Sequence, residues 1–176
     1  MADRIELFKK EYAGLAWSFQ VNPSSCGNNT HYELYLRTSA ISDNLCGRGT
    51  THVYIRGEGK ETRILGFITL RASSYVKLYE DRFEGYPALE ILELAVDEAY
   101  EGQGVGDALM KFAILTAVEL NQNTLGIRYI VLCADPQAVS YYERYKFERI
   151  EDQGKVPRDG WNDNCIPMFV KLPEIT

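Results

Sequence analysis

Three glycines at alternate positions, Gly102, Gly104 and Gly106, lie between an apolar run at 91–96 and a helical pattern that continues to Leu120. The first N–H groups of a helix have no acceptor within it, and the helix dipole adds partial positive charge there. Glycine lets an anion approach these N–H groups because no Cβ obstructs it. This stretch therefore predicts a binding site for a phosphorylated ligand.

The spacing excludes two common nucleotide motifs. No Lys-Ser or Lys-Thr pair follows the glycines, as the nucleotide P-loop requires, and Leu109 occupies the last glycine position of the dinucleotide fingerprint. The alternative to an anion site is a glycine-rich turn that binds nothing.

Residues 94–110, LAVDEAYEGQGVGDALM, resemble the acyl-CoA loop of the GNAT superfamily of N-acetyltransferases. The loop of that family reads [QR]-x-x-G-x-[GA], and Gly104 and Gly106 match its two small positions. Glu101 departs from the pattern, because it stands where the family has Arg or Gln.

A second stretch, residues 135–147, is similar to the family pattern N-x-x-A-x-x-F-Y-x-[KR]-x-G-F. Ala138, Tyr142 and Arg144 match it, whereas Asp135 replaces Asn and Lys146 replaces Gly. With the two motifs in the expected order, the chain is identified as a member of the GNAT superfamily.

The resemblance implies direct transfer of an acetyl group from acetyl-CoA to a primary amine, with no metal. It also assigns the residues that contact acetyl-CoA. They are Leu94, Ala95 and Val96 at the end of a strand, Glu101, Gly102, Gln103, Gly104, Val105, Gly106 and Asp107 in the loop, and Asp135.

Tyr142 occupies the position of the family's general acid. A phenol with a pKa of about 10 is able to protonate a departing thiolate of similar basicity. The alternative interpretation is a core tyrosine at helical spacing.

Glu93 is the candidate base that accepts the proton of the amine, directly or through water. It alternates with Leu92 and Leu94, so we expect it on the polar side of the strand, and Glu90 is a second candidate. A solvated or paired carboxylate is the alternative for Glu93. His52 opens a strand without an evident acidic partner, which favours a packed or surface histidine.

The pattern of elements predicts an α+β fold with a GNAT-like mixed, mostly antiparallel sheet and helices on both faces. We expect one domain over 1–176, with 1–29 as an N-terminal extension. The expected helices are 3–14, one from Thr30 to Gly47, 105–120 and 137–145; the expected strands are 17–21, 52–55, 64–70, 91–96, 129–133, 147–150 and 168–172.

Charge and cysteine usage limit location and partners. The net charge of −6 argues against a broad basic surface for nucleic acid. No stretch approaches the roughly 20 apolar residues of a membrane span. Four isolated cysteines, Cys26, Cys46, Cys133 and Cys165, predict free thiols in a reducing cytoplasm.

Three functions remain open. The first is an acetyltransferase that acts on a small molecule, a peptide or a protein. The second is a toxin that acetylates the aminoacyl group of charged tRNA, because residues 30–71 are similar to the GNAT branch that includes such toxins; the acidic charge opposes it, since each phosphate contact needs Lys or Arg. The third is a non-catalytic acyl-CoA sensor. Homodimerisation is possible in each case.

Overall fold

The computed structural model describes residues 3–24, 29–151, 154–156 and 164–174. The β-strands are Arg4–Leu7 (β1), Thr50–Arg56 (β2), Arg63–Tyr79 (β3), Arg82–Val96 (β4), Tyr129–Ala134 (β5), Glu148–Arg149 (β6), Gly154–Lys155 (β7) and Ile166–Lys171 (β8). The α-helices are Asn29–Thr38 (α1), Ala40–Cys46 (α2), Val105–Asn123 (α3) and Val139–Glu143 (α4). The 3-10 turns are Lys10–Tyr12 (η1), Leu15–Trp17 (η2), Gly59–Glu61 (η3), Glu98–Tyr100 (η4) and Pro136–Ala138 (η5).

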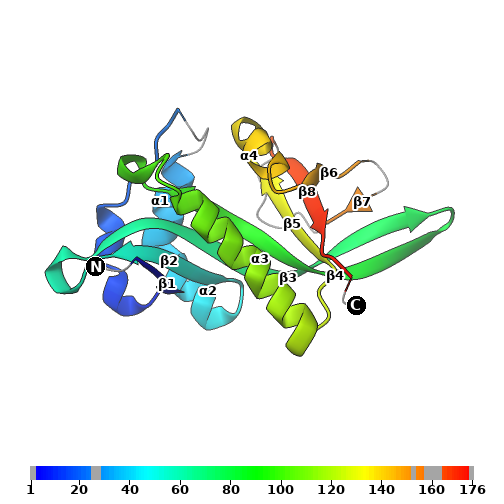
Figure 1. The fold of residues 1–176 in the computed structure, drawn as a ribbon, viewed down its shortest axis with the longest axis horizontal. Helices are drawn as coiled ribbons and strands as arrows, with labels where there is room; N and C mark the ends of the chain where they lie inside the picture. Colours follow the sequence, from blue (N-terminus) through cyan, green and yellow to red (C-terminus); the bar gives the residue numbers. More distant parts are fainter. Residues whose placement is uncertain (1–2, 25–28, 152–153, 157–163, 175–176) are drawn as a thin grey trace. The chain divides into compact units, whose positions relative to one another are not determined.

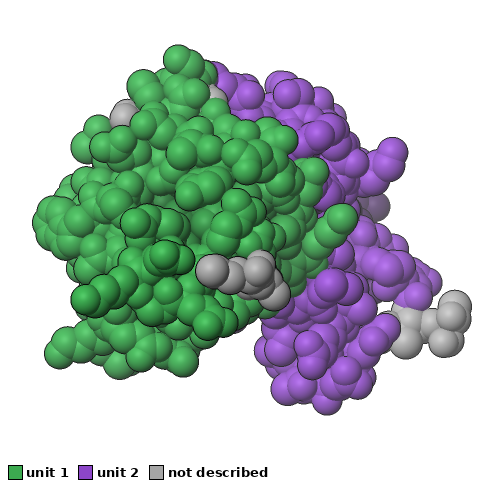
Figure 2. Space-filling model, turned by 60° about the vertical axis from the view of Figure 1, so that its left-hand side comes forward, with its two compact units in different colours: residues 1–71, 92–112 green, residues 72–91, 113–176 purple. Residues whose placement is uncertain are grey.

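The chain forms two compact units, one of residues 1–71 and 92–112 and the other of 72–91 and 113–176 (Figure 2). In the first unit the strands are ordered β1-β2-β3-β4; in the second, β4-β5-β8-β6, with β7 paired to β3 (Figure 1). The β4–β5 pair is parallel, whereas the β1–β2, β2–β3, β5–β8 and β6–β8 pairs are antiparallel. The sheet thus has the mixed, mostly antiparallel character that the sequence predicts. Among the described helices, none is long and apolar enough to cross a membrane.

In the first unit, helices cover both faces of the sheet. Val53 and Ile55 of β2 are buried in an apolar cluster with side chains of α1, α2 and the segment before them. His52 points to the opposite face, where its ring lies 4.7 Å from the ring of Phe112 in α3. This alternation follows from the two-residue period of a strand, and it explains why the apolar residues of β2 occupy every second position.

The N-terminal segment differs from the prediction. Residues 4–7 form a strand instead of a helix, because they hydrogen-bond along the edge of β2, with Ile5 opposite Tyr54. The strand expected at 17–21 is also wrong, since its first residue ends η2 and residues 18–22 are irregular. Pairing with a distant strand edge decides the first case, and no local pattern reports such an edge.

The helix expected from Thr30 to Gly47 is divided at Ser39 into α1 and α2. Leu34 of α1 and Leu45 of α2 are 56% and 84% exposed. The Glu33 carboxylate accepts a hydrogen bond from the backbone N–H of Val21 at 3.0 Å, so it stabilises the preceding segment.

In the second unit, β5 occupies the predicted run 129–133, and its neighbours are packed around aromatic rings. The ring of Tyr129 lies 4.8 Å from that of Tyr75 in β3 and 5.9 Å from that of Phe169 in β8. The segment 72–87 continues β3 to Tyr79 and begins β4 at Arg82.

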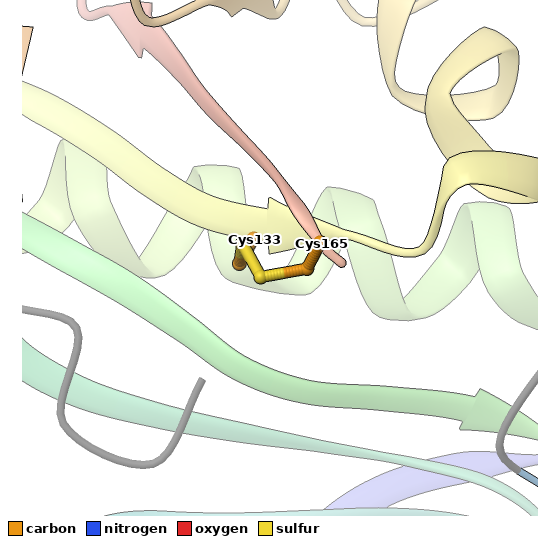
Figure 3. The surroundings of a disulfide bond; sticks show 2 residues. All are labelled: Cys133 and Cys165. Atoms are coloured by element: carbon orange, nitrogen blue, oxygen red, sulfur yellow. A yellow bond between two sulfur atoms is a disulfide. The ribbon is translucent and has the colours of Figure 1, made fainter. Parts of the chain in front are cut away.

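A disulfide joins Cys133 at the end of β5 to Cys165, which precedes β8 (Figure 3). The expectation of free thiols is therefore wrong for these two residues, whereas Cys46 is free and exposed, and Cys26 lies outside the described residues. Antiparallel pairing of β5 with β8 brings together cysteines 32 residues apart, with Cα atoms separated by 5.4 Å. The bond also removes the cysteine argument for a reducing cytoplasm.

Candidate active site

The glycine loop connects β4 to α3 in the first unit. Gly102 and Gly104 have φ values of +71° and +81°, and no atom lies within 4 Å of the position that a Cβ would take at either residue. Such φ values disfavour other residues, and the open space fits the approach of an anion. The N–H of Ala108 donates to the Gly104 carbonyl at 3.0 Å. The N–H groups of residues 105–107 precede that bond, so the helix itself offers them no acceptor.

Backbone hydrogen bonds fix the start of this loop to the N-terminal segment. The carboxylate of Asp97, which is 7% exposed, accepts from the N–H groups of Ala99 and Gln20, each at 3.0 Å. The N–H of Glu98 donates to the Gln20 carbonyl at 2.8 Å. These bonds hold the end of β4 and the first turn of the loop in one conformation.

Glu101, the residue that departs from the family pattern, contacts the same segment. Its Oε2 accepts a hydrogen bond from Nδ2 of Asn22 at 3.2 Å. A carboxylate that is engaged by a side chain of the N-terminal segment serves to position the loop. Contact between Glu101 and acetyl-CoA stays a prediction.

The candidate base Glu93 lies in the part of β4 that belongs to the first unit. The expectation that it faces solvent is wrong, because its side chain is only 9% exposed and shares a face with buried Ile91 and Ala95. Its Oε1 lies 2.8 Å from Nε2 of His31 in α1. The sequence therefore predicted the alternation of the strand but assigned Glu93 to the wrong face, and its role as base stays a prediction.

Burial and partners act in opposite directions on the pKa of Glu93. Desolvation raises it, and the hydrogen bond and charge of His31 lower it, with a net increase. The bond to Glu93 raises the pKa of His31 above its usual value, although desolvation opposes the increase. The bond to Glu93 thus stabilises the protonated imidazole, so His31 keeps its proton to higher pH than an isolated histidine.

Tyr142 lies in α4 of the second unit and is 8% exposed. Its ring makes edge-to-face contacts with Tyr141 at 5.2 Å and with Phe147 at 5.9 Å. These contacts fix the orientation of the ring. They are compatible with a general acid and with a core tyrosine alike.

The residues that depart from the second motif keep its backbone geometry. The carboxylate of Asp135 accepts from the N–H of Gln137 at 3.0 Å and caps η5, as expected for an Asp-Pro start. The helix that follows is shorter than expected and ends at Glu143. Lys146 adopts a φ of +67°, so it takes the left-handed conformation for which the family uses glycine.

The remaining candidate side chains are packed or deeply buried. Glu90 is 0% exposed in β4, in register with Val131 of β5, and an acceptor amine cannot reach it there. Burial next to Phe112 lowers the pKa of His52. Among the described residues, no group of three His, Cys, Asp or Glu side chains is placed to hold a metal ion.

His31 is the residue that sequence analysis missed. It is one of two histidines in the chain and lies in the first helix, 62 positions before its partner Glu93. The only local signal was a histidine near the start of a helix, which says nothing about a distant carboxylate.

The comparison with family models decides the assignment. Residues 48–149 match the model described as the acetyltransferase (GNAT) domain. The chain belongs to the GNAT acetyltransferase family. It is accordingly an N-acetyltransferase with acetyl-CoA as its co-substrate.

Solved structures of GNAT toxins have the same fold. A tyrosine-to-phenylalanine mutant of KacT is 17% identical, with a TM-score of 0.75 over 97% of this chain and 95% of that one. AtaT complexed with acetyl-methionyl-tRNAfMet is 18% identical, with a TM-score of 0.73 over 94% of each chain. AtaTR bound with acetyl-CoA is 21% identical, with a TM-score of 0.71 over 96% of this chain and 92% of that one.

Proposed function

We propose that this acetyltransferase acts on the α-amino group of an aminoacyl-tRNA. The observation that carries the proposal is the match to AtaT complexed with acetyl-methionyl-tRNAfMet, which covers 94% of both chains. Because it covers 94% of this chain, that match also includes most of residues 1–47, which precede the family model's match at 48–149. The sequence alone favours a small molecule, a peptide or a protein as the acceptor; because of the structural match, we rank charged tRNA before them in this proposal.

A small molecule, a peptide or a protein is the second candidate acceptor. The net charge of −6 favours it, because tRNA phosphates are held by Lys and Arg. The proposal of a tRNA acceptor therefore requires that the protein contacts the tRNA mainly at its aminoacyl end.

We assign the site residues as follows. N–H groups at Leu94, Ala95 and Val96 hold the thioester oxygen where negative charge develops. Residues Glu101–Asp107 of the loop provide the N–H groups for the pyrophosphate of acetyl-CoA, and Asp135 lies near its pantetheine arm. Tyr142 donates a proton to the departing thiolate, and Glu93 belongs to the system that accepts the proton of the amine.

The acceptor is tested with defined substrates. Purified protein is mixed with acetyl-CoA labelled in the acetyl group and with tRNA charged with methionine, and uncharged tRNA and free methionine serve as controls. We expect label that precipitates with charged tRNA only and that mild alkali releases as acetyl-methionine. Transfer to free amines with none to charged tRNA would reject the tRNA acceptor in favour of the second candidate.

Further parts of the proposal concern the whole protein. We propose that residues 1–176 act as one domain. In support, the N-terminal segment is part of the first unit, because β1 and the segment around Gln20 hydrogen-bond to β2 and to the loop. We place the protein in the cytoplasm, where acetyl-CoA and charged tRNA occur. A homodimer stays a prediction, which light scattering on the purified protein tests.

A further inference from the structure

His31 and Glu93 form a pair that is buried at one end and open at the other. The Glu93 side chain is 9% exposed, whereas the His31 side chain is 43% exposed, and Nε2 and Oε1 are 2.8 Å apart. A substrate amine that approaches from solvent therefore meets the imidazole before the carboxylate. The carboxylate lies behind the ring as its hydrogen-bond partner.

Neighbouring aromatic rings hold the imidazole in place. The ring of Tyr32 lies edge-on to it at 5.4 Å, and the ring of Tyr35 is stacked at 6.4 Å. Tyr35 is itself fixed, because it is 8% exposed and stacks on Phe67 of β3. The position of His31 is thus set by its hydrogen bond to Glu93 and by the rings of Tyr32 and Tyr35, while part of the imidazole stays open to solvent.

The hydrogen bond also selects the basic atom of the ring. When Glu93 is ionised its carboxylate only accepts, so Nε2 then donates to it, and the lone pair of a neutral imidazole is on Nδ1. When Nδ1 takes a second proton, the resulting imidazolium is stabilised by the carboxylate behind it. A carboxylate performs the same function for the histidine of a serine-protease triad.

Charged groups on each neighbouring element complete the electrostatic environment. Arg71 of β3 favours the ionised form of Glu93, and Asp43 of α2 disfavours it. Asp43 is neutralised in part by Arg48, whose Nη2 lies 2.8 Å from its Oδ1. From α1, His31 is the dominant influence, and the buried phenol of Tyr35 is neutral at physiological pH because burial raises its pKa.

We propose that His31 is the general base that accepts the proton of the acceptor amine, with Glu93 as the residue that positions it. The inference rests on the acetyl transfer to an amine and deepens it. The ammonium gives one proton to Nδ1 of His31, which passes it to water at the exposed face of the ring. The neutral nitrogen then bonds to the thioester carbon, the carbon–sulfur bond breaks, and the nitrogen loses its second proton as the departing thiolate takes one up.

The pair also indicates the class of amine. An α-amino group has a pKa of about 8, whereas a lysine side chain has one of about 10.4. The pKa of an α-ammonium group is closer to that of an imidazole than the pKa of a lysine side chain is, so proton transfer to the imidazole is less unfavourable from the α-ammonium group. The site therefore fits an α-amine, as in an aminoacyl ester or a peptide N-terminus, better than a lysine side chain.

The test uses His31→Gln, in which an amide still donates to Glu93 but cannot accept a proton. The matched control is His52→Gln, which replaces the chain's other histidine. The pH profile of kcat/KM is measured by release of CoA thiol, with whichever amine the wild-type protein acetylates. For His31→Gln we expect a loss of about 10²-fold at the wild-type optimum and loss of the acid limb of the profile. Acetyl-CoA affinity and the profile of His52→Gln should remain at wild-type values.

A second variant distinguishes loss of the base from loss of the fold. His31→Ala that still binds acetyl-CoA should recover at least tenfold of its lost rate when imidazole is added. A His31→Gln profile with an unchanged acid limb, or no imidazole rescue of His31→Ala, would overturn the role of His31. Failure of the tRNA acceptor is seen separately, as wild-type transfer to small amines but not to charged tRNA. Absence of wild-type transfer to any amine would contradict both proposals.

Discussion

Glu93 and Tyr142, the two side chains predicted to act in catalysis, are equally buried but lie in different surroundings. Each residue is 8% exposed. Glu93 in the first unit has a histidine at 2.8 Å, whereas Tyr142 in the second unit has the rings of Tyr141 and Phe147 around it. Buried aromatic contacts are ordinary for a core tyrosine, but a desolvated carboxylate with one partially exposed partner is uncommon outside functional sites. Burial alone does not identify a catalytic group; the chemistry of its partners does.

One of the two largest effects is expected when the charge of Glu93 is removed, which tests whether its histidine partner matters for catalysis. Glu93→Gln keeps the shape but leaves His31 without its counter-charge, so we expect kcat to fall by about 10²-fold, as for His31→Gln. Acetyl-CoA affinity should change less than twofold in equilibrium dialysis. Glu98→Gln, at an exposed carboxylate of the loop, is the control and should have wild-type turnover. Near-normal turnover of Glu93→Gln would make the His31 pair purely structural.

Tyr142→Phe tests the other side of the comparison. The variant loses only the hydroxyl, and we expect turnover to fall by about 10²-fold while acetyl-CoA binding and the melting temperature are retained. Tyr145→Phe, in the same short segment, is the matched control. Turnover equal to wild type would assign Tyr142 to the core of the second unit.

Gly104→Val tests the role of the glycine loop in acetyl-CoA binding, independently of Glu93 and Tyr142. Valine at a φ of +81° is strained, and its side chain enters the open space in front of the loop N–H groups. We expect acetyl-CoA to bind about tenfold more weakly, as measured by calorimetry. Gly47→Val imposes similar strain at a φ of +71° in open space away from the loop. Equal losses of affinity in the two variants would show that strain, and not the loop, is responsible.

A smaller effect is expected next to the helix of Tyr142. Lys146 has a φ of +67°, which glycine adopts at no steric cost, so Lys146→Gly should raise the free energy of unfolding by about 1 kcal/mol. Urea denaturation measures the change, with Lys155→Gly in β7 as a control that should not stabilise. Unaltered or lower stability of Lys146→Gly would mean that Lys146 gains more from its contacts than its backbone costs.

The smallest expected effect concerns the two histidines, whose pKa values should be shifted in opposite directions from the usual value. The bond to Glu93 raises the pKa of His31, so its contribution to stability is present below about pH 6.5 and is lost as pH rises through the folded value. Burial lowers the pKa of His52, so its contribution is present above about pH 6.5 and is lost as pH falls through the folded value. Proton NMR should resolve two imidazole titrations, one on each side of the usual value. Equal midpoints would contradict the different environments.

Local features were predictable from the sequence, and distant contacts were not. The glycine loop, the Asp135 cap and the alternation of β4 depend on residues within a few positions of each other. The His31–Glu93 pair and the Cys133–Cys165 bond join residues 62 and 32 positions apart, and only the folded sheet brings them together. The same reason explains why β1 was taken for a helix, and why Glu93 was assigned to the wrong face.

The most direct test of the central claim makes no assumption about the acceptor. Acetyl-CoA labelled in the acetyl group is incubated with the purified protein and a desalted lysate supplemented with its small-molecule fraction, and the products are separated into RNA, protein and metabolites. We predict label in RNA that ribonuclease solubilises and that mild alkali releases with an amino acid attached. Label confined to protein or metabolites would contradict the aminoacyl-tRNA acceptor.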